Sequence, residues 1–377
     1  MTPNPDPELT LDPRPPESHR TESEPGPPHP VHSNPVDSTD SAGIAGSAKS
    51  RKVQPASSLH VGRRRRAPSA GLTALVAVGM FILALALLLP FFVYPRLTVQ
   101  PDNPDILRIL TTNDGSALIP DLSAPAGARL MQHIPVSIST YISQHRGQRT
   151  TADNVVWQLG TRVEAAGHLL RARIEVVSLN KQTAQPSNCC GDSLATVQDQ
   201  PAVPINHIGL ITFPFNSKKQ DYSVWDVNLN RSRSAVYSGT ARRNGMLVYK
   251  YTASNSWLPV GTQALPGALF DLKGPSVTAT GQYADRRTYF VEPNTGATLG
   301  IEEQLDQRYV YDNRAVTAIS ALLESPSLPA DRLNQTRLGA TMLPWLRGRA
   351  SIVLVVLALL LFAGAAVLAR RSRVKTG

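Results

Sequence analysis

Two long apolar runs without a charged side chain constrain this sequence more than any other feature. They extend over residues 71–94 and 350–369. Each run is long enough to cross a hydrocarbon core of roughly 30 Å as a helix. A buried helix of a soluble fold does not need apolar residues on every side, so we expect two transmembrane α-helices over these residues.

Basic residues at the outer ends of both runs predict the orientation. Lys and Arg next to a span resist translocation and stay on the cytoplasmic side. The residues concerned are Arg63, Arg64, Arg65 and Arg66 before the first span, and Arg370, Arg371 and Arg373 after the second. We therefore expect a two-pass plasma-membrane protein with both termini cytoplasmic and residues 95–349 extracytoplasmic. A cleaved signal peptide would have a shorter charged region and a shorter apolar run.

The formal net charge of +10 could indicate a nucleic-acid partner. The excess lies partly beside the spans and is otherwise dispersed in pairs, so we expect no nucleic-acid binding. Residues 1–70 are rich in Pro, Ser and acidic side chains and predict a disordered cytoplasmic tail. Residues 370–377 form a short basic cytoplasmic tail.

The segment 95–349 reads as a mainly β, or β-rich α+β, domain between the two spans. Short runs of β-type residues alternate with Gly, Pro, Asn and Asp, which is typical of an antiparallel sheet. The strongest candidate strands are Arg171–Leu179, Gly209–Phe215, Ser234–Ser238, Met246–Thr252, Ser276–Tyr283 and Arg287–Val291. Residues 293–296 predict a turn with Gly296 at positive φ, followed by a strand at Ala297–Gln304. Ile106–Leu110, Val155–Leu159 and Tyr309–Leu323 are weaker candidates for strands, and the last of these has a helix leading to the membrane as its alternative.

The chain has two cysteines, and they are adjacent, at Cys189 and Cys190. Adjacent cysteines can close a vicinal disulfide, pair with another chain or stay reduced. An oxidising compartment outside the membrane favours the first of these. A metal site would need more ligands nearby, so we predict no metal and no cofactor.

No motif for catalysis stands out in the outer segment. Its four histidines, His133, His145, His168 and His207, lie in no recognisable triad, and no Gly-x-Ser-x-Gly is present. Glu302 and Glu303 are adjacent carboxylates, but on a strand they point to opposite faces, so a solvated edge is the expected arrangement. We therefore predict a protein that is not an enzyme.

Several short motifs, taken in order, resemble a known family. They are Phe213-Pro214-Phe215-Asn216, Tyr222 with Trp225-Asp226, Tyr237-Ser238-Gly239, Gly245-Met246-Leu247-Val248-Tyr249, and Tyr289 through Gly296. Together with the order helix, β-rich domain, helix over residues 72–369, they resemble actinobacterial two-helix envelope membrane proteins of unknown function, a family that often carries the name porin PorA. Asn216 stands where the family pattern leads us to expect Asp.

The resemblance implies a role in building the cell envelope. We expect a noncatalytic accessory protein that binds a lipid or glycolipid, or helps transport it, at the outer face of the plasma membrane, alongside a transporter or envelope-assembly proteins. The aromatic residues of the motifs are candidates to line a lipid pocket or to fill the core; these are Phe213, Phe215, Tyr222, Trp225, Tyr249 and Tyr289. The alternative is a membrane scaffold or wall-status sensor with a partner-binding tail. An envelope hydrolase and a porin rank behind both, since a two-helix anchor closes no membrane barrel.

Overall fold

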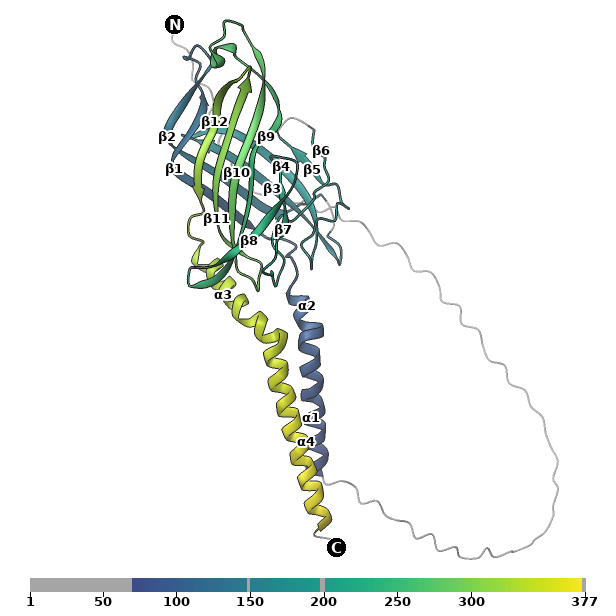
Figure 1. Cartoon of the computed structure of the whole chain (residues 1–377). Coiled ribbons are helices and arrows are strands. Elements are labelled where there is room, and N and C mark those ends of the chain that lie inside the picture. Colours follow the sequence, from purple (N-terminus) through teal and green to yellow (C-terminus); the bar gives the residue numbers. More distant parts are fainter. Residues whose placement is uncertain (1–69, 148–149, 197–200, 375–377) are drawn as a thin grey trace, which may run out of the picture. The chain divides into compact units, whose positions relative to one another are not determined.

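The computed structural model describes residues 70–147, 150–196 and 201–374. Within them a twelve-stranded sheet adjoins two long helical segments (Figure 1). The helical elements are α1 (Ala70–Leu88), η1 (Leu89–Val93), α2 (Tyr94–Leu97), η2 (Gly267–Phe270), α3 (Ala330–Pro344), η3 (Trp345–Arg349) and α4 (Ala350–Val374). The strands are β1 (Ile106–Pro120), β2 (Ala128–Gln144), β3 (Asn154–Ala165), β4 (His168–Asn180), β5 (Ser193–Ala195), β6 (Val203–Pro204), β7 (Tyr222–Asp226), β8 (Arg231–Arg243), β9 (Met246–Leu265), β10 (Val277–Val291), β11 (Thr298–Tyr311) and β12 (Arg314–Glu324).

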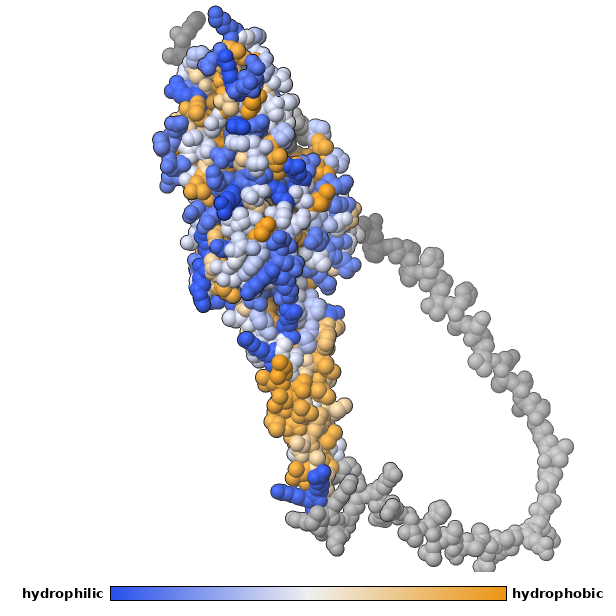
Figure 2. Space-filling model, in the orientation of Figure 1, coloured by the Kyte–Doolittle hydropathy of each residue, from blue (hydrophilic) through white to orange (hydrophobic). Residues whose placement is uncertain are grey.

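Both predicted spans lie in helical segments long and apolar enough to cross a membrane, Ala70–Leu97 and Ala330–Arg371. Figure 2 shows hydrophobic surface gathered over these helices, whereas the visible face of the sheet is largely hydrophilic. The second segment begins well before residue 350, because α3 and η3 precede α4 without a break. Pro90 lies within the π-helical turn η1, and Pro344 directly precedes η3. A proline without an N–H disturbs the helical ladder, which accounts for both π-helical turns.

Small residues form the contact between α1 and α4. Gly79 and Ala86 are buried on α1, and Ala358 and Ala365 are buried on α4. On each helix the two residues are seven apart, which places them on one face of a left-handed pair. Phe362 fills the space beside Gly79, where an added Cβ would lie 2.6 Å from the ring.

The sheet has the strand order β6-β5-β4-β3-β2-β1-β12-β11-β10-β9-β8-β7, so its first and last long strands meet in the middle. The pair β1 and β12 is antiparallel, with Thr111 opposite Glu324 and Ala117 opposite Ile319. The start of β1 and the end of β12 therefore lie at the same end of the sheet. Both helical segments connect to that end, where Arg332 of α3 donates to the backbone carbonyl of Asp105.

Three of the hairpins turn through two residues, and both residues of each turn have positive φ. The three turns are Ala166-Gly167 between β3 and β4, Asn244-Gly245 between β8 and β9, and Asp312-Asn313 between β11 and β12. Such turns match the right-handed twist of antiparallel strands, and Asn, Asp and Gly tolerate the left-handed backbone best.

The core follows the alternation of each strand. Along β10, Ala279, Tyr283 and Asp285 are buried while their neighbours are less so. This period of two is typical of a sheet with one covered face. Leu323 of β12 and Val136 of β2 belong to the same buried cluster as Tyr283.

The prediction of a β-rich domain is confirmed, but one of the predicted strands was wrong, and so was the helix considered for residues 309–323. Residues 209–215 form no strand; Leu210 alone bridges to Val224, in parallel. Gly209 has a φ of 99° and Asn216 a φ of 57°, and Pro214 lacks an N–H, so this segment cannot continue a ladder. The weaker strand prediction at 309–323 is confirmed and its helix alternative was wrong, since these residues form the end of β11 and most of β12. Its β-branched residues Val310, Val316 and Thr317 are paired in the sheet.

The turn predicted at residues 293–296 is present and joins two of the family-like motifs. Buried Glu292 accepts hydrogen bonds from the backbone N–H groups of Asn294 and Thr295, at 3.1 and 2.8 Å. Gly296 has a φ of 71°, and a Cβ there would lie 2.5 Å from the carbonyl oxygen of Phe213. Asn216 follows in the same loop, and its Oδ1 accepts a hydrogen bond from Arg347 at 2.6 Å.

Candidate functional site

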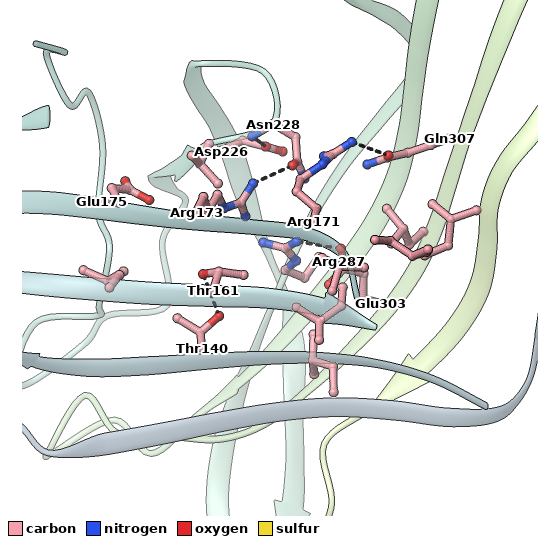
Figure 3. A pocket seen from close by; sticks show the side chains of 18 of the residues that line it. Thr140, Thr161, Arg171, Arg173, Glu175, Asp226, Asn228, Arg287, Glu303 and Gln307 are labelled. Carbon is pink, nitrogen blue, oxygen red and sulfur yellow. Dashed lines mark hydrogen bonds and ion pairs between the residues drawn. The ribbon is translucent and has the colours of Figure 1, made fainter. Parts of the chain in front are cut away.

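The candidate site is a cavity of about 390 Å³ lined mainly by strands of the sheet. It is lined from both halves of the strand order, by β1 to β4, by β7 and by β9 to β12, and also by residues 210–213 and 227–228. One part of its wall is apolar, with Leu110, Ile138, Leu159, Ile301 and Leu305. The other part carries charged and polar side chains (Figure 3), namely Thr140, Thr161, Arg171, Arg173, Glu175, Asp226, Asn228, Arg287, Glu303 and Gln307.

Arg287 of β10 and Glu303 of β11 form an ion pair in this wall. The distance from Arg287 Nη2 to Glu303 Oε1 is 2.6 Å, and the Glu303 side chain is 1% exposed. Burial by itself would lower the pKa of Arg287, but the charge of Glu303 holds it well above its usual value. Glu303 is therefore not on a solvated edge, as the sequence suggested, because its face of β11 is the covered one.

Two further arginines in the wall, Arg108 of β1 and Arg173 of β4, form no ion pair within the described residues. Arg173 Nη1 donates to Asn228 Oδ1 at 2.8 Å, and Arg108 Nη1 has only a long contact of 3.5 Å to the Ile211 carbonyl. Burial is the largest effect on both and lowers the pKa of Arg108 and that of Arg173, the latter to about 10. Repulsion from Arg287 acts in the same direction on both arginines.

Beside the cavity, His207 is buried between two carboxylates. Its Nδ1 lies 2.8 Å from Asp192 Oδ2 and its Nε2 lies 2.8 Å from Glu175 Oε1. Burial alone would lower the pKa of His207, but the hydrogen bonds to Asp192 and Glu175 raise it to about 9. The imidazole is therefore protonated at neutral pH, and both ring nitrogens donate. The edge of the ring also meets Trp225, with ring centroids 5.0 Å apart.

The loop that carries the cysteines is connected to this cluster. Cys189 and Cys190 are joined by a disulfide with an S–S distance of 2.06 Å. The side chain of Asn188 makes two hydrogen bonds to the backbone of His207. Its Nδ2 donates to the carbonyl oxygen at 2.9 Å, and its Oδ1 accepts from the N–H at 2.8 Å. Ser178 Oγ donates to Asp192 and accepts from the N–H of Cys189 at 3.1 Å.

The aromatic residues predicted from the motifs fall into two groups. Phe213, Trp225 and Tyr289 line the cavity. Tyr222 and Tyr249 pack against the buried cluster around Phe213 and Tyr251. Phe213 stacks on Tyr251 with ring centroids 4.9 Å apart, so these rings mainly contact one another. Phe215 is half-buried in the loop that follows Phe213.

The basic residues predicted to flank the membrane are described in part. Arg370 and Arg371 lie in the last turns of α4. Arg63, Arg64, Arg65 and Arg66 lie outside the described residues, and the side chain of Arg373 is not among the described ones.

Sequence reasoning missed the charged wall and the histidine between carboxylates. Arg171, Arg173 and Glu175 alternate along β4 and so share one face of the strand, which was a readable signal. Arg108, Arg287 and His207 come from distant parts of the chain, and only the fold brings them together.

Fold and site together define a protein with two membrane-type helices and a β-sheet domain that encloses a charged cavity. A family model described as Porin PorA matches residues 72–367. The chain therefore belongs to the Porin PorA family, as its motifs suggested. A protein of Corynebacterium amycolatum named Porin PorA is 21% identical over an alignment of 373 positions, gaps included, and the alignment covers 75% of this chain and 96% of that protein.

These comparisons correct the predicted function. The prediction of an accessory protein that binds or transports a lipid or glycolipid was wrong, because the family and the relative both point to a porin, a non-enzymatic channel-type protein. That prediction depended on the tethered domain and on the role that the family resemblance implied. Several of the motif aromatics, which were candidates for a lipid pocket or for the core, pack against one another in the core. A porin ranked low because a single chain with two helices closes no barrel in the membrane. That argument considered one chain alone and not an assembly of several chains.

Proposed function

We propose that this protein takes part in the passage of small polar solutes through the cell envelope. The observation that carries the proposal is the match of the Porin PorA family model, which spans both membrane-type helices and the sheet between them. The charged cavity supports it, because a wall of arginine, glutamate, threonine and amide side chains suits a hydrated solute.

The proposal includes the orientation expected from the positive-inside rule. Arg370 and Arg371 then lie on the cytoplasmic side, and the sheet lies on the outer side. The partner that follows from this arrangement is the plasma membrane. Association with a transporter or with envelope-assembly proteins stays a prediction, and so does the scaffold role of the tail, which lies outside the described residues.

The proposal also requires more than one chain. The first helical segment carries no charged side chain between residues 71 and 94, and the second carries none between residues 350 and 369. One chain therefore offers no polar path across a hydrocarbon core. Several chains would have to assemble, with the sheet domains and their cavities around a common entrance. A solute would meet the cavity wall before it reached the membrane.

Conductance of the full-length protein in planar lipid bilayers tests the proposal. We expect discrete current steps that are absent from protein-free bilayers. Ala318 lines the cavity on β12, whereas Ala315 on the same strand is exposed. Ala318→Trp should reduce the current by narrowing the cavity, and the matched variant Ala315→Trp should leave it unchanged. If the wild-type protein inserts but carries no current, the proposed function is wrong.

A further inference from the structure

We propose that Arg108, Arg173 and Arg287 form a binding site for the oxyanion group, carboxylate or phosphate, of a small solute. This proposal depends on the proposed function in one respect, namely that the ligand is a solute. The binding site itself follows from the charges and the hydrogen-bond donors of the cavity.

The three guanidinium groups come from β1, β4 and β10 and face one cavity. Like charges that share a poorly solvated space repel each other. Burial is the main cause of the lowered pKa of Arg108 and of Arg173, and the charge of Arg287 adds to the lowering of each. An anion between the three groups would remove the repulsion.

Each carboxylate of the wall already has a partner, although the second oxygen of Glu303, Oε2, is buried without one among the described residues. Glu175 accepts from His207, and Glu303 accepts from Arg287. Asp226 pairs with Arg233, whose Nε lies 2.8 Å from Asp226 Oδ2. Arg108 and Arg173 thus form no ion pair with a carboxylate in the described part of the chain, although the nearby charges of Glu175 and Asp226 act to raise the pKa of Arg173.

Hydrogen-bond donors in the wall lack acceptors as well. Arg173 Nε, Arg287 Nε and Trp225 Nε1 are buried, and none has a hydrogen-bond partner among the residues that the structure describes. All three residues line the cavity. Buried donors in folded proteins are nearly always satisfied, so three orphaned donors around one cavity indicate an acceptor ligand. Guanidinium groups match the planar or tetrahedral oxygens of carboxylate and phosphate through paired N–H donors.

The cavity also limits the size of the ligand. Its volume of about 390 Å³ lies at the lower end of the range for small-molecule sites. Thr140 and Thr161, whose hydroxyl groups are 3.1 Å apart, offer further polar contacts, as do the amides of Asn228 and Gln307. A small organic anion or inorganic phosphate fits this wall.

Calorimetric titration of the detergent-solubilised full-length protein tests the site. The probes are inorganic phosphate and succinate, each against chloride at equal ionic strength. We expect saturable binding of at least one of the two oxyanions and none of chloride. Arg108→Gln and Arg173→Gln should each weaken binding about tenfold or more. Arg286→Gln should leave it unchanged, because Arg286 precedes Arg287 on β10 but is exposed.

A second variant separates binding from folding. Arg173→Lys keeps the charge but removes the paired donors, so it should weaken oxyanion binding with an unchanged circular dichroism spectrum. Equal binding by wild type and by the glutamine variants would overturn the site, and so would the absence of oxyanion binding. The protein could instead bind vesicles of anionic lipid and show no binding of phosphate or succinate. That outcome would overturn the assignment of the site to a solute. Binding without bilayer conductance would uphold the site and refute the porin function, whereas conductance without binding would do the reverse.

Discussion

Arg287 and Glu303 lie directly opposite each other on β10 and β11, and Arg287 Nη2 donates to Glu303 Oε1 at 2.6 Å. The contact joins two charged groups on the covered face of the sheet, where the Glu303 side chain is 1% exposed. A buried pair of this kind adds little net stability by itself, but each partner makes the other's burial tolerable.

Removal of one partner should therefore destabilise the domain strongly. We expect Arg287→Met to lower the free energy of unfolding by about 3 kcal/mol, because Glu303 would stay buried without a counterion. Urea denaturation followed by tryptophan fluorescence measures the change. The double variant Arg287→Met with Glu303→Leu should recover most of the loss. If the double variant is as unstable as the single one, the pair does not act as argued.

His207 should make stability depend on pH in the alkaline range. Its pKa is raised to about 9 in the folded protein from 6.5, so the stabilisation is fully present below about pH 6.5 and is lost as the pH rises through 9. The loss is on the order of 3 kcal/mol, because a tenfold difference in proton affinity between the folded and unfolded protein corresponds to about 1.4 kcal/mol. The groups that face the imidazole are Asp192 and Glu175, with Arg173 close to Glu175.

The free energy of unfolding, measured from pH 6 to pH 10, checks this prediction. His207→Gln should be less stable than wild type at pH 6, and its free energy of unfolding should change little between pH 6.5 and 9. The same alkaline slope in wild type and variant would rule out His207 as its source.

At low pH a different group, Asp192, makes stability depend on pH. Burial alone would raise the pKa of Asp192, but hydrogen bonds from His207 and Ser178 lower it. Stability from Asp192 is therefore lost as the pH falls below its usual pKa of 3.8.

The sequence predicted the elements whose signal is local. The two apolar runs predicted the helices, and the runs of β-type residues at 171–179 and 246–252 predicted parts of β4 and β9. The turn at Gly296 was predictable because Pro, Asn, Thr and Gly favour it in that order. The segment 209–215 misled because its apolar residues serve the core from a loop, with Leu210 and Phe213 buried.

The candidate site was not predictable for a different reason. Arg108, Arg173 and Arg287 are far apart in sequence, and each looks like an ordinary solvated residue of a strand. Only the meeting of β1 with β12, the first and last long strands, brings the two halves of the sheet around one cavity. His207 gave no signal either, because its partners Asp192 and Glu175 stand 15 and 32 residues away.

Gly296 should be intolerant of any side chain. It has a φ of 71°, and an added Cβ would lie 2.5 Å from the carbonyl oxygen of Phe213. Gly245 also has positive φ, at 78°, but no atom of the described residues lies within 4 Å of that position. We expect Gly245→Ala to lower the free energy of unfolding by about 1 kcal/mol, from backbone strain alone. Gly296→Ala should lower the free energy of unfolding by about 3 kcal/mol, because the backbone strain and the overpacking against Phe213 both contribute. Equal losses in urea denaturation would show that the contact with Phe213 has no consequence.

Gly79 should decide how closely the two membrane-type helices pack. Its missing side chain leaves room for the ring of Phe362, and it shares one face of α1 with Ala86, seven residues on. In a hydrocarbon environment helices gain little from the hydrophobic effect on pairing, so close contact between small residues supplies much of the attraction. Gly79→Leu should force the helices apart and lower the stability of the pair by about 1 to 3 kcal/mol.

Gly364 provides the matched control on the partner helix, since it is exposed on α4 and an added Cβ would meet no atom of the described chain within 4 Å. Gly364→Leu adds the same apolar group to the lipid-facing side and should leave the pair intact. Thermal unfolding in detergent micelles, followed by circular dichroism at helix wavelengths, distinguishes the two variants. If Gly79→Leu and Gly364→Leu both unfold at the same temperature as wild type, the pairing of α1 and α4 does not depend on their small-residue contact. The helices would then act as separate anchors, held near each other only by the central strands β1 and β12 to which they connect.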